Sequence, residues 1–212
     1  MPARPRWTAA VTGLSLAAVL ALLGASAKGP LMGRPAPGPP ADYGPLPAFA
    51  LIDQAGAPMT LERLRGSVWI AGFVFTRCAG QCPLITSRMA GLQRALAGAP
   101  ELHLVSFSVD PAHDTPEILA AYARRLGAGD RWHWVTGAPG AVASLARAGF
   151  RLGVSEDGTA EEPITHSVRL VLVDRAGHVR GSYDSTEDDA MQRLESDARL
   201  LLRDPGSARV EG

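Results

Sequence analysis

Two cysteines four residues apart are the side chains in this sequence best suited to chemistry. Cys78 and Cys82 are the only cysteines of the 212-residue chain, and both lie in the segment TRCAGQCP, residues 76–83. Two sulfurs on one short loop can form a disulfide, act as a redox couple or share a soft metal ion. The spacing does not choose among these roles, and it also fits an inert buried pair or a purely structural disulfide.

The elements around the cysteines favour a chemical role. Residues 68–75, VWIAGFVF, are typical of a strand buried on both faces, and residues 83–97 carry apolar side chains at helical spacing. Pro83 suits the first helical position, so Cys82 is expected at or beside the helix N-cap, where the helix dipole favours a thiolate. The carboxyl end of a central strand is also where α/β sheets carry their chemistry.

A third metal ligand would come from one of five histidines. His103, His133 and His178 are expected to be ordinary strand, surface or solvated residues. His113, in the segment DPAHD, follows a predicted strand, so its loop could approach the cysteines. His166, just before another buried strand, is also a candidate. Two thiolates and one imidazole suit Cu(I), and sites of this type also bind Cu(II), whereas zinc would need a fourth ligand.

The rest of the chain predicts alternating strands and helices. We expect strands at 49–52, 102–109, 132–135 and 168–173, a hairpin partner at 178–183, and helices at 60–64, 116–126, 141–148 and 188–202. Thr60 and Thr186 are expected to cap the first and last of these helices, and Asp114 or Thr115 the second. This order predicts an α/β domain with a mixed sheet flanked by helices.

The N-terminal region predicts export. Residues 8–27 carry no charge and follow Arg4 and Arg6, and about 20 helical residues span the hydrocarbon core of a bilayer. Residues 1–28 therefore predict a hydrophobic helix that anchors the protein in a membrane with the domain outside the cytoplasm, or a signal segment cleaved after the small residues 25–27. We expect a proline-rich linker that does not pack at 29–47, a folded domain at 48–203 and a flexible tail at 204–212.

The charge balance excludes nucleic acid as a partner. Lys and Arg total 21, as do Asp and Glu, and residues 1–41 hold four basic residues and no acid. The remaining chain, with 17 basic and 21 acidic residues, is net acidic, whereas nucleic-acid binding needs a basic face.

Three segments together resemble the Sco/SenC family of copper chaperones. They are TRCAGQCP at 76–83, VDPAHDTPE at 109–117 and THSVRLVLVDRAGHVRGSY at 165–183, and the resemblance extends over about residues 44–202. It implies a thioredoxin-like fold. It also implies that Cys78, Cys82 and His166 bind copper, that the two cysteines cycle between dithiol and disulfide, and that Asp110 matches an aspartate near the site. Ala79 departs from the family, many of whose members have proline there.

The implied task is delivery of copper to the copper site of cytochrome c oxidase subunit II, or to another acceptor, by a metallochaperone rather than an enzyme. A thiol–disulfide reductant would be a further partner. The alternative is an extracytoplasmic thiol–disulfide oxidoreductase, which needs Cys78 and Cys82 but not His166. A peroxide-reducing thiol enzyme is a third hypothesis, in which Thr76 and Arg77 would assist Cys78.

Overall fold

The computed structural model describes residues 38–78, 80–155 and 165–204, with the backbone alone at residues 155, 165 and 166. In chain order the elements are β1 (Ala50–Asp53), β2 (Pro58–Thr60), α2 (Leu61–Leu64), β3 (Val68–Val74), α3 (Cys82–Ala95), β4 (Leu102–Ser108), α4 (Pro116–Arg125), β5 (Trp132–Thr136), α5 (Ala141–Ala148), β6 (Val154–Ser155), β7 (Thr165–His166), β8 (Arg169–Val173), β9 (Val179–Asp184) and α6 (Asp188–Arg203).

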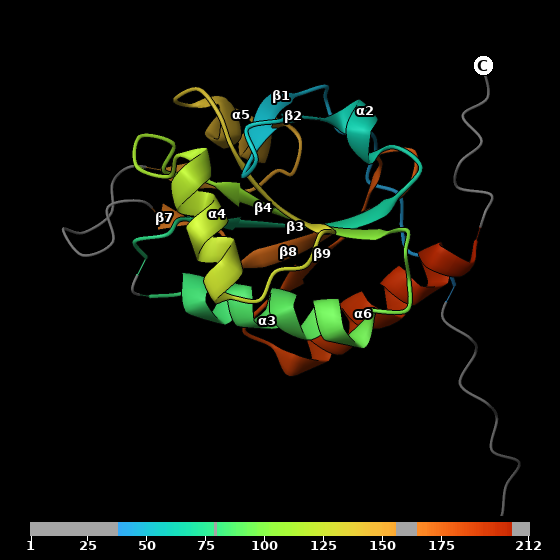
Figure 1. The fold of residues 1–212 in the computed structure, drawn as a ribbon. Helices are drawn as coiled ribbons and strands as arrows, with labels where there is room; N and C mark the ends of the chain where they lie inside the picture. Colours follow the sequence, from blue (N-terminus) through green and yellow to red (C-terminus); the bar gives the residue numbers. More distant parts are fainter. Residues whose placement is uncertain (1–37, 79, 156–164, 205–212) are drawn as a thin grey trace, which may run out of the picture. The chain divides into compact units, whose positions relative to one another are not determined.

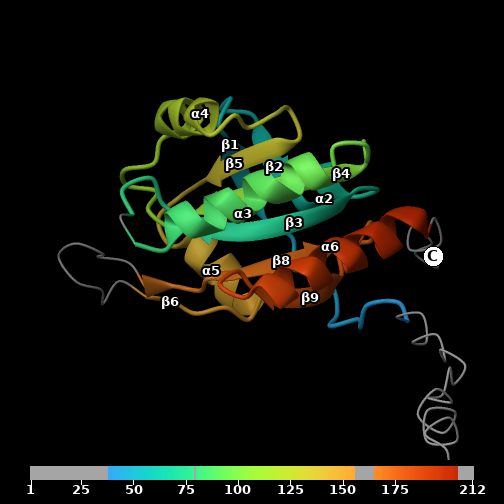
Figure 2. The same cartoon turned by 90° about the horizontal axis from the view of Figure 1, so that it is seen from below.

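A mixed sheet in the order β2-β1-β5-β4-β3-β8-β9 forms the centre of the domain. Strands β3, β4 and β5 run parallel, and the outer strands pair antiparallel to their neighbours. Helices α3 and α6 lie together on one face of this sheet, and α5 lies on the other (Figures 1 and 2). This confirms the predicted mixed sheet flanked by helices.

Strand β3 is the most buried part of the sheet, as its apolar sequence predicts, with all seven residues buried. Trp69 and Phe73 pack against Phe150, which follows α5, with ring centroids 6.1 and 5.3 Å apart. Gly72 faces the opposite side, where a Cβ atom would lie 3.1 Å from Leu170 and 3.5 Å from the side chain of Ile85 on α3. Helix α3 therefore packs closely against the strand that leads into the cysteine loop.

Two of the predicted helix caps are confirmed and one is wrong. The hydroxyls of Thr60 and Thr115 accept N–H groups in the first turns of α2 and α4. Thr186 does not cap α6: the N-cap is Glu187, and the Thr186 hydroxyl donates to the carboxylate of Asp184 at 2.6 Å. A competing bond to the preceding turn takes the hydroxyl away from the helix.

The proline-rich linker predicted at 29–47 ends earlier than expected, because its last residues pack against the β8–β9 hairpin. We call residues 40–46 the N-terminal strap. The backbone amide of Tyr43 donates to Val179, which in turn donates to Gly44, at 2.9 and 3.0 Å. Leu46 is buried in the core. The folded domain therefore begins near residue 40, not at 48.

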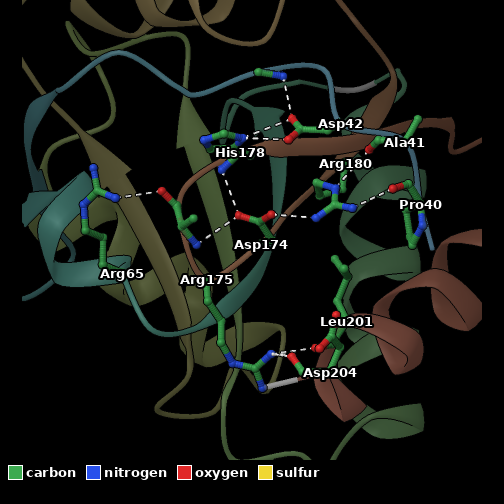
Figure 3. A network of polar contacts seen from close by, with 12 residues as sticks. Pro40, Ala41, Asp42, Arg65, Asp174, Arg175, His178, Arg180, Leu201 and Asp204 are labelled. Carbon is green, nitrogen blue, oxygen red and sulfur yellow. Dashed lines mark hydrogen bonds and ion pairs between the residues drawn. The ribbon is translucent and has the colours of Figure 1, made fainter. Parts of the chain in front are cut away.

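Charged side chains also hold the strap to the hairpin (Figure 3). The guanidinium of Arg180 donates to the carbonyls of Pro40 and Ala41 and pairs with the buried carboxylate of Asp174 at 2.8 Å. His178, which the sequence predicts to be solvated, lies 2.9 Å from the carboxylate of Asp42. Partners more than 130 residues away thus order a segment whose composition predicts no packing.

Within the described ranges, no helix is long and apolar enough to cross a membrane. The predicted hydrophobic helix at 1–28 lies outside those ranges, as do residues 29–37 of the linker and 205–212 of the tail.

Candidate metal centre

The cysteine loop leaves the carboxyl end of β3 and enters α3. Thr76 and Arg77 follow the strand, and the amide of Cys78 donates to the carbonyl of Phe75 at 3.3 Å. Helix α3 begins at Cys82 with a proline in its first turn and Gln81 as N-cap. The expectation that Cys82 lies at or beside the helix N-cap is therefore confirmed.

The two cysteines meet at the start of α3. Both are thiols, Cys78 half-buried and Cys82 fully buried. The sulfur of Cys78 accepts the backbone N–H of Cys82 at 3.4 Å. The sequence predicts that Cys82 benefits from the helix terminus, but it is Cys78 that receives this first helical amide. The loop thus folds its first sulfur back onto the residue that carries the second.

A buried carboxylate fixes the beginning of this loop. Asp114, with no exposed surface, accepts the backbone N–H of Thr76 at 3.1 Å and its hydroxyl at 2.5 Å. The same carboxylate accepts the hydroxyl of Ser108, at the end of β4, at 2.6 Å. The sequence offered Asp114 only as a possible cap for α4, a position that Thr115 occupies. Its place in the segment DPAHDTP, directly after a predicted strand, is the signal that could have marked it.

A second carboxylate holds the next residue. The buried Asp110 pairs with the half-exposed guanidinium of Arg77 at 2.5 Å. The structure therefore places Asp110 beside the cysteine loop, on the loop between β4 and α4. In a peroxide-reducing site Thr76 and Arg77 would assist Cys78, but here both side chains are bound to carboxylates. This arrangement argues against the hypothesis of a peroxide-reducing enzyme.

Helix α4 places the side chain of Tyr122 near Cys82. Burial raises the pKa of Tyr122, and the electrostatic influence of the nearby Cys82 raises it further, while a hydrogen bond with Thr86 lowers it. Thr86 donates its hydroxyl to the carbonyl of Cys82 at 2.9 Å, and the Tyr122 ring packs edge-on against Trp134, with centroids 5.2 Å apart. Nothing in the sequence indicates that Tyr122 lies near the cysteines, because this proximity depends on how α4 packs.

His166 lies on β7, where its backbone pairs with Val154. Strand β8 runs antiparallel to β3 with Val171 opposite Ala71, so the start of β8 lies at the end of β3 that leads to the cysteines. His166 precedes that start by three residues. Its side chain is outside the described part of the structure, and its ligand role stays a prediction.

The other histidines lie elsewhere or have other partners. His103 and His133 share a hydrogen bond of 2.9 Å between adjacent strands, and His133 is buried among the strands rather than on the surface. Burial, followed by the influence of His103, lowers the pKa of His133 to about 4. His113 is half-buried on the loop that also carries Asp110, and its amide donates to the carbonyl of Asp110. That loop does approach the cysteines, as expected.

No group of three or more His, Cys, Asp and Glu side chains is arranged to hold a metal ion among the residues that the structure describes. The structure does bring the sulfur of Cys78 to the backbone amide of Cys82, so both thiols belong to the start of α3. A pair of soft sulfur donors fits a soft metal ion such as copper, and an imidazole would complete a three-ligand site.

Comparisons with known proteins agree with this architecture. Residues 40–200 match the family model SCO1/SenC. The SCO1 protein homolog of Bacillus subtilis is 32% identical over 154 residues, which cover 71% of this chain and 79% of that protein. A putative copper-binding protein of Stutzerimonas stutzeri is 32% identical over 156 residues, covering 70% of this chain and 74% of the relative.

Solved structures show the same thioredoxin-like fold. A SCO1/SenC family lipoprotein from Bacillus anthracis superposes with a TM-score of 0.70 at 28% identity, covering 76% of this chain and 96% of that one. Bradyrhizobium japonicum ScoI with copper bound has a TM-score of 0.64 at 21% identity, with coverage of 74% and 99%, which supports the fold alone. Since the family model matches most of the chain and relatives above 30% identity cover more than two thirds of it, the chain belongs to the SCO1/SenC family.

Proposed function

We propose that this protein is a copper metallochaperone that binds copper through Cys78, Cys82 and His166. The observation that carries the proposal is the contact between the two cysteines, in which the sulfur of Cys78 lies 3.4 Å from the amide nitrogen of Cys82. The position of β7 and β8 supports His166 as the third ligand. A relative is named a putative copper-binding protein, and structures of similar fold hold copper.

The acceptor in this proposal is the copper site of cytochrome c oxidase subunit II. One solved relative of similar fold, BsSco, is described as a member of the Sco family of cytochrome c oxidase assembly proteins. The acceptor's thiolates would replace Cys78 and Cys82 one at a time, because thiolate ligands exchange without leaving the metal uncoordinated. Residues 1–28 would anchor the protein, with the domain on the extracytoplasmic side of the membrane, in keeping with the lipoprotein among its structural relatives.

Protons compete with copper for this donor set. Sulfur and imidazole bind metal only when deprotonated, so copper affinity falls as the pH is lowered. Oxidation of the two thiols to a disulfide removes two of the three ligands. The reduced pair is therefore the form that carries copper, and an external thiol reductant would restore it.

Copper titration of the reduced protein with X-ray absorption tests the ligand set. We expect sub-micromolar binding by the wild type and loss of a sulfur shell in Cys78→Ser. His166→Ala should lose a nitrogen ligand, whereas His113→Ala, the matched histidine control on the neighbouring loop, should bind as the wild type does. If His113→Ala loses the nitrogen ligand and His166→Ala keeps it, the proposed third ligand is wrong. Absence of sub-micromolar binding by the wild type removes the proposal.

A thiol–disulfide oxidoreductase is the second candidate, because both cysteines are thiols within one loop and one is half-buried rather than sealed. A relative of similar fold is described as having a disulfide switch. This function needs no imidazole. Full activity of His166→Ala in oxidase assembly, together with loss of activity in Cys78→Ser, would favour it over copper delivery.

A further inference from the structure

Asp114 is a fully buried carboxylate that the proposed copper chemistry does not use. Its two oxygens accept three hydrogen bonds, from the amide and hydroxyl of Thr76 and the hydroxyl of Ser108. None of these donors carries a charge. Burying a carboxylate is costly and is tolerated when its hydrogen bonds are satisfied. A buried carboxylate with these three hydrogen bonds holds Thr76 and Ser108 in fixed positions relative to each other.

The three bonds join separate parts of the chain at the root of the cysteine loop. Ser108 ends β4, and Thr76 is the second residue after β3. The amide of Asp114 donates to the carbonyl of Asp110 at 2.9 Å, so the carboxylate projects from a closed turn rather than an open loop. Thr76 is bound through both its backbone and its side chain, which leaves its position little freedom relative to the two strands.

We propose that Asp114 is a positioning residue for Cys78, an inference that rests on the proposed copper site. By fixing Thr76, the carboxylate sets the direction in which the loop leaves β3. Two residues later the sulfur of Cys78 reaches the first amide of α3, 3.4 Å away. The loop is then ordered before copper arrives, and metal binding does not have to supply the ordering free energy.

Substitutions at Thr76 test this role without touching a ligand or the buried carboxylate. Thr76→Val keeps the shape of the side chain and removes the hydroxyl donor, whereas Thr76→Ser keeps the donor. Thr60→Val is the matched control. It removes a threonine hydroxyl that accepts a hydrogen bond from the backbone N–H of Arg63, and Thr60 lies far from the cysteines in the sequence. Two measurements are made on each protein: amide hydrogen exchange without metal, and the affinity of the reduced protein for Cu(I).

We expect amides at residues 76–82 to exchange about tenfold faster in Thr76→Val than in the wild type, while amides of β3 keep their rates. Tenfold corresponds to about 1.4 kcal/mol. Cu(I) affinity should fall by about the same factor, and Thr76→Ser should restore both values. Thr60→Val should leave both unchanged. Asp114→Asn, which places an amide donor against the donors of Thr76 and Ser108, provides a second test if Thr76→Val does not fold.

Unchanged exchange of the loop in both Thr76→Val and Asp114→Asn would overturn the proposal. Faster loop exchange with unaltered Cu(I) affinity would overturn it too, because the carboxylate would then order a loop that copper does not need ordered. If the wild type itself binds no Cu(I), the proposed function fails, and the exchange data still decide whether Asp114 holds the loop. The two failures are therefore distinguishable.

Discussion

The pair His103 and His133 predicts a loss of stability in mild acid that can be assigned to one side chain. His133 is buried on β5 and shares a 2.9 Å hydrogen bond with His103 on β4. Burial, then His103 and then Arg63 lower the pKa of His133 to about 4, and Asp53 acts weakly in the opposite direction. Burial and nearby arginines also lower the pKa of His103. Both lowered pKa values favour the neutral imidazole over the charged one in the folded protein.

The sign follows from the lowered pKa. The unfolded chain takes up a proton near the ordinary histidine value of 6.5, and the folded protein resists until about pH 4. The stability that the neutral His133 ring contributes is thus fully present above pH 6.5 and is lost as the pH falls toward 4. For His133 alone the loss is about 2 kcal/mol between pH 7 and pH 5, and about 3 kcal/mol by pH 4.

Urea unfolding of the metal-free protein at a series of pH values measures this loss. His133→Gln places a neutral amide near the position of the imidazole Nε2, so its stability should fall by about 2 kcal/mol less than that of the wild type between pH 7 and pH 5. His113→Gln, at a half-buried loop position, is the control and should follow the wild type. The reasoning is refuted if the stability difference between His133→Gln and the wild type is the same at both pH values.

Two further predictions concern packing and charge. Gly72→Ala places a methyl group 3.1 Å from Leu170, so we expect a loss of about 1–3 kcal/mol in urea unfolding. Gly91→Ala on α3 meets nothing within 4 Å and should instead gain up to about 1 kcal/mol; equal effects of the two substitutions would contradict the close packing of Gly72 against Leu170. Arg180→Ala leaves the carboxylate of Asp174, with 4% of its side chain exposed, without its guanidinium partner and should cost about 3 kcal/mol. A cost below 1 kcal/mol, with the strap still protected in hydrogen exchange, would show that backbone bonds alone hold the strap.

Elements that depend on local sequence were predictable. The apolar run of β3 and the capping residues Thr60 and Thr115 are confirmed, because burial on both faces and cap hydrogen bonds leave direct marks in composition and spacing. The prediction for Thr186 fails for a local reason as well: its hydroxyl donates to the neighbouring carboxylate of Asp184 and does not accept an N–H group from the first turn of α6. Composition does not decide between such neighbours.

Elements that depend on distant partners were not predictable in the same way. The strap looked like a linker because its prolines lack amide donors, yet the amides of Tyr43 and Leu46 remain and pair with the carbonyls of Val179 and Gly177. The strands β6 and β7 are two residues each, too short to leave a periodic pattern. In both cases the segment's own sequence does not reveal the hydrogen-bond partners that a distant segment supplies.

The cysteine site also has one part that depends on local sequence and one part that depends on distant partners. Spacing was enough to predict that Cys78 and Cys82 meet at the start of a helix, because the loop between them is short. Which sulfur receives the helical amide depends on the direction in which the loop leaves β3. That direction is set by a carboxylate 38 residues beyond Thr76. The residues that could ligate copper can thus be proposed from the sequence. For Asp114 the sequence indicates only a place directly after a strand, and its contact with Thr76 is seen once β3 and β4 are placed side by side.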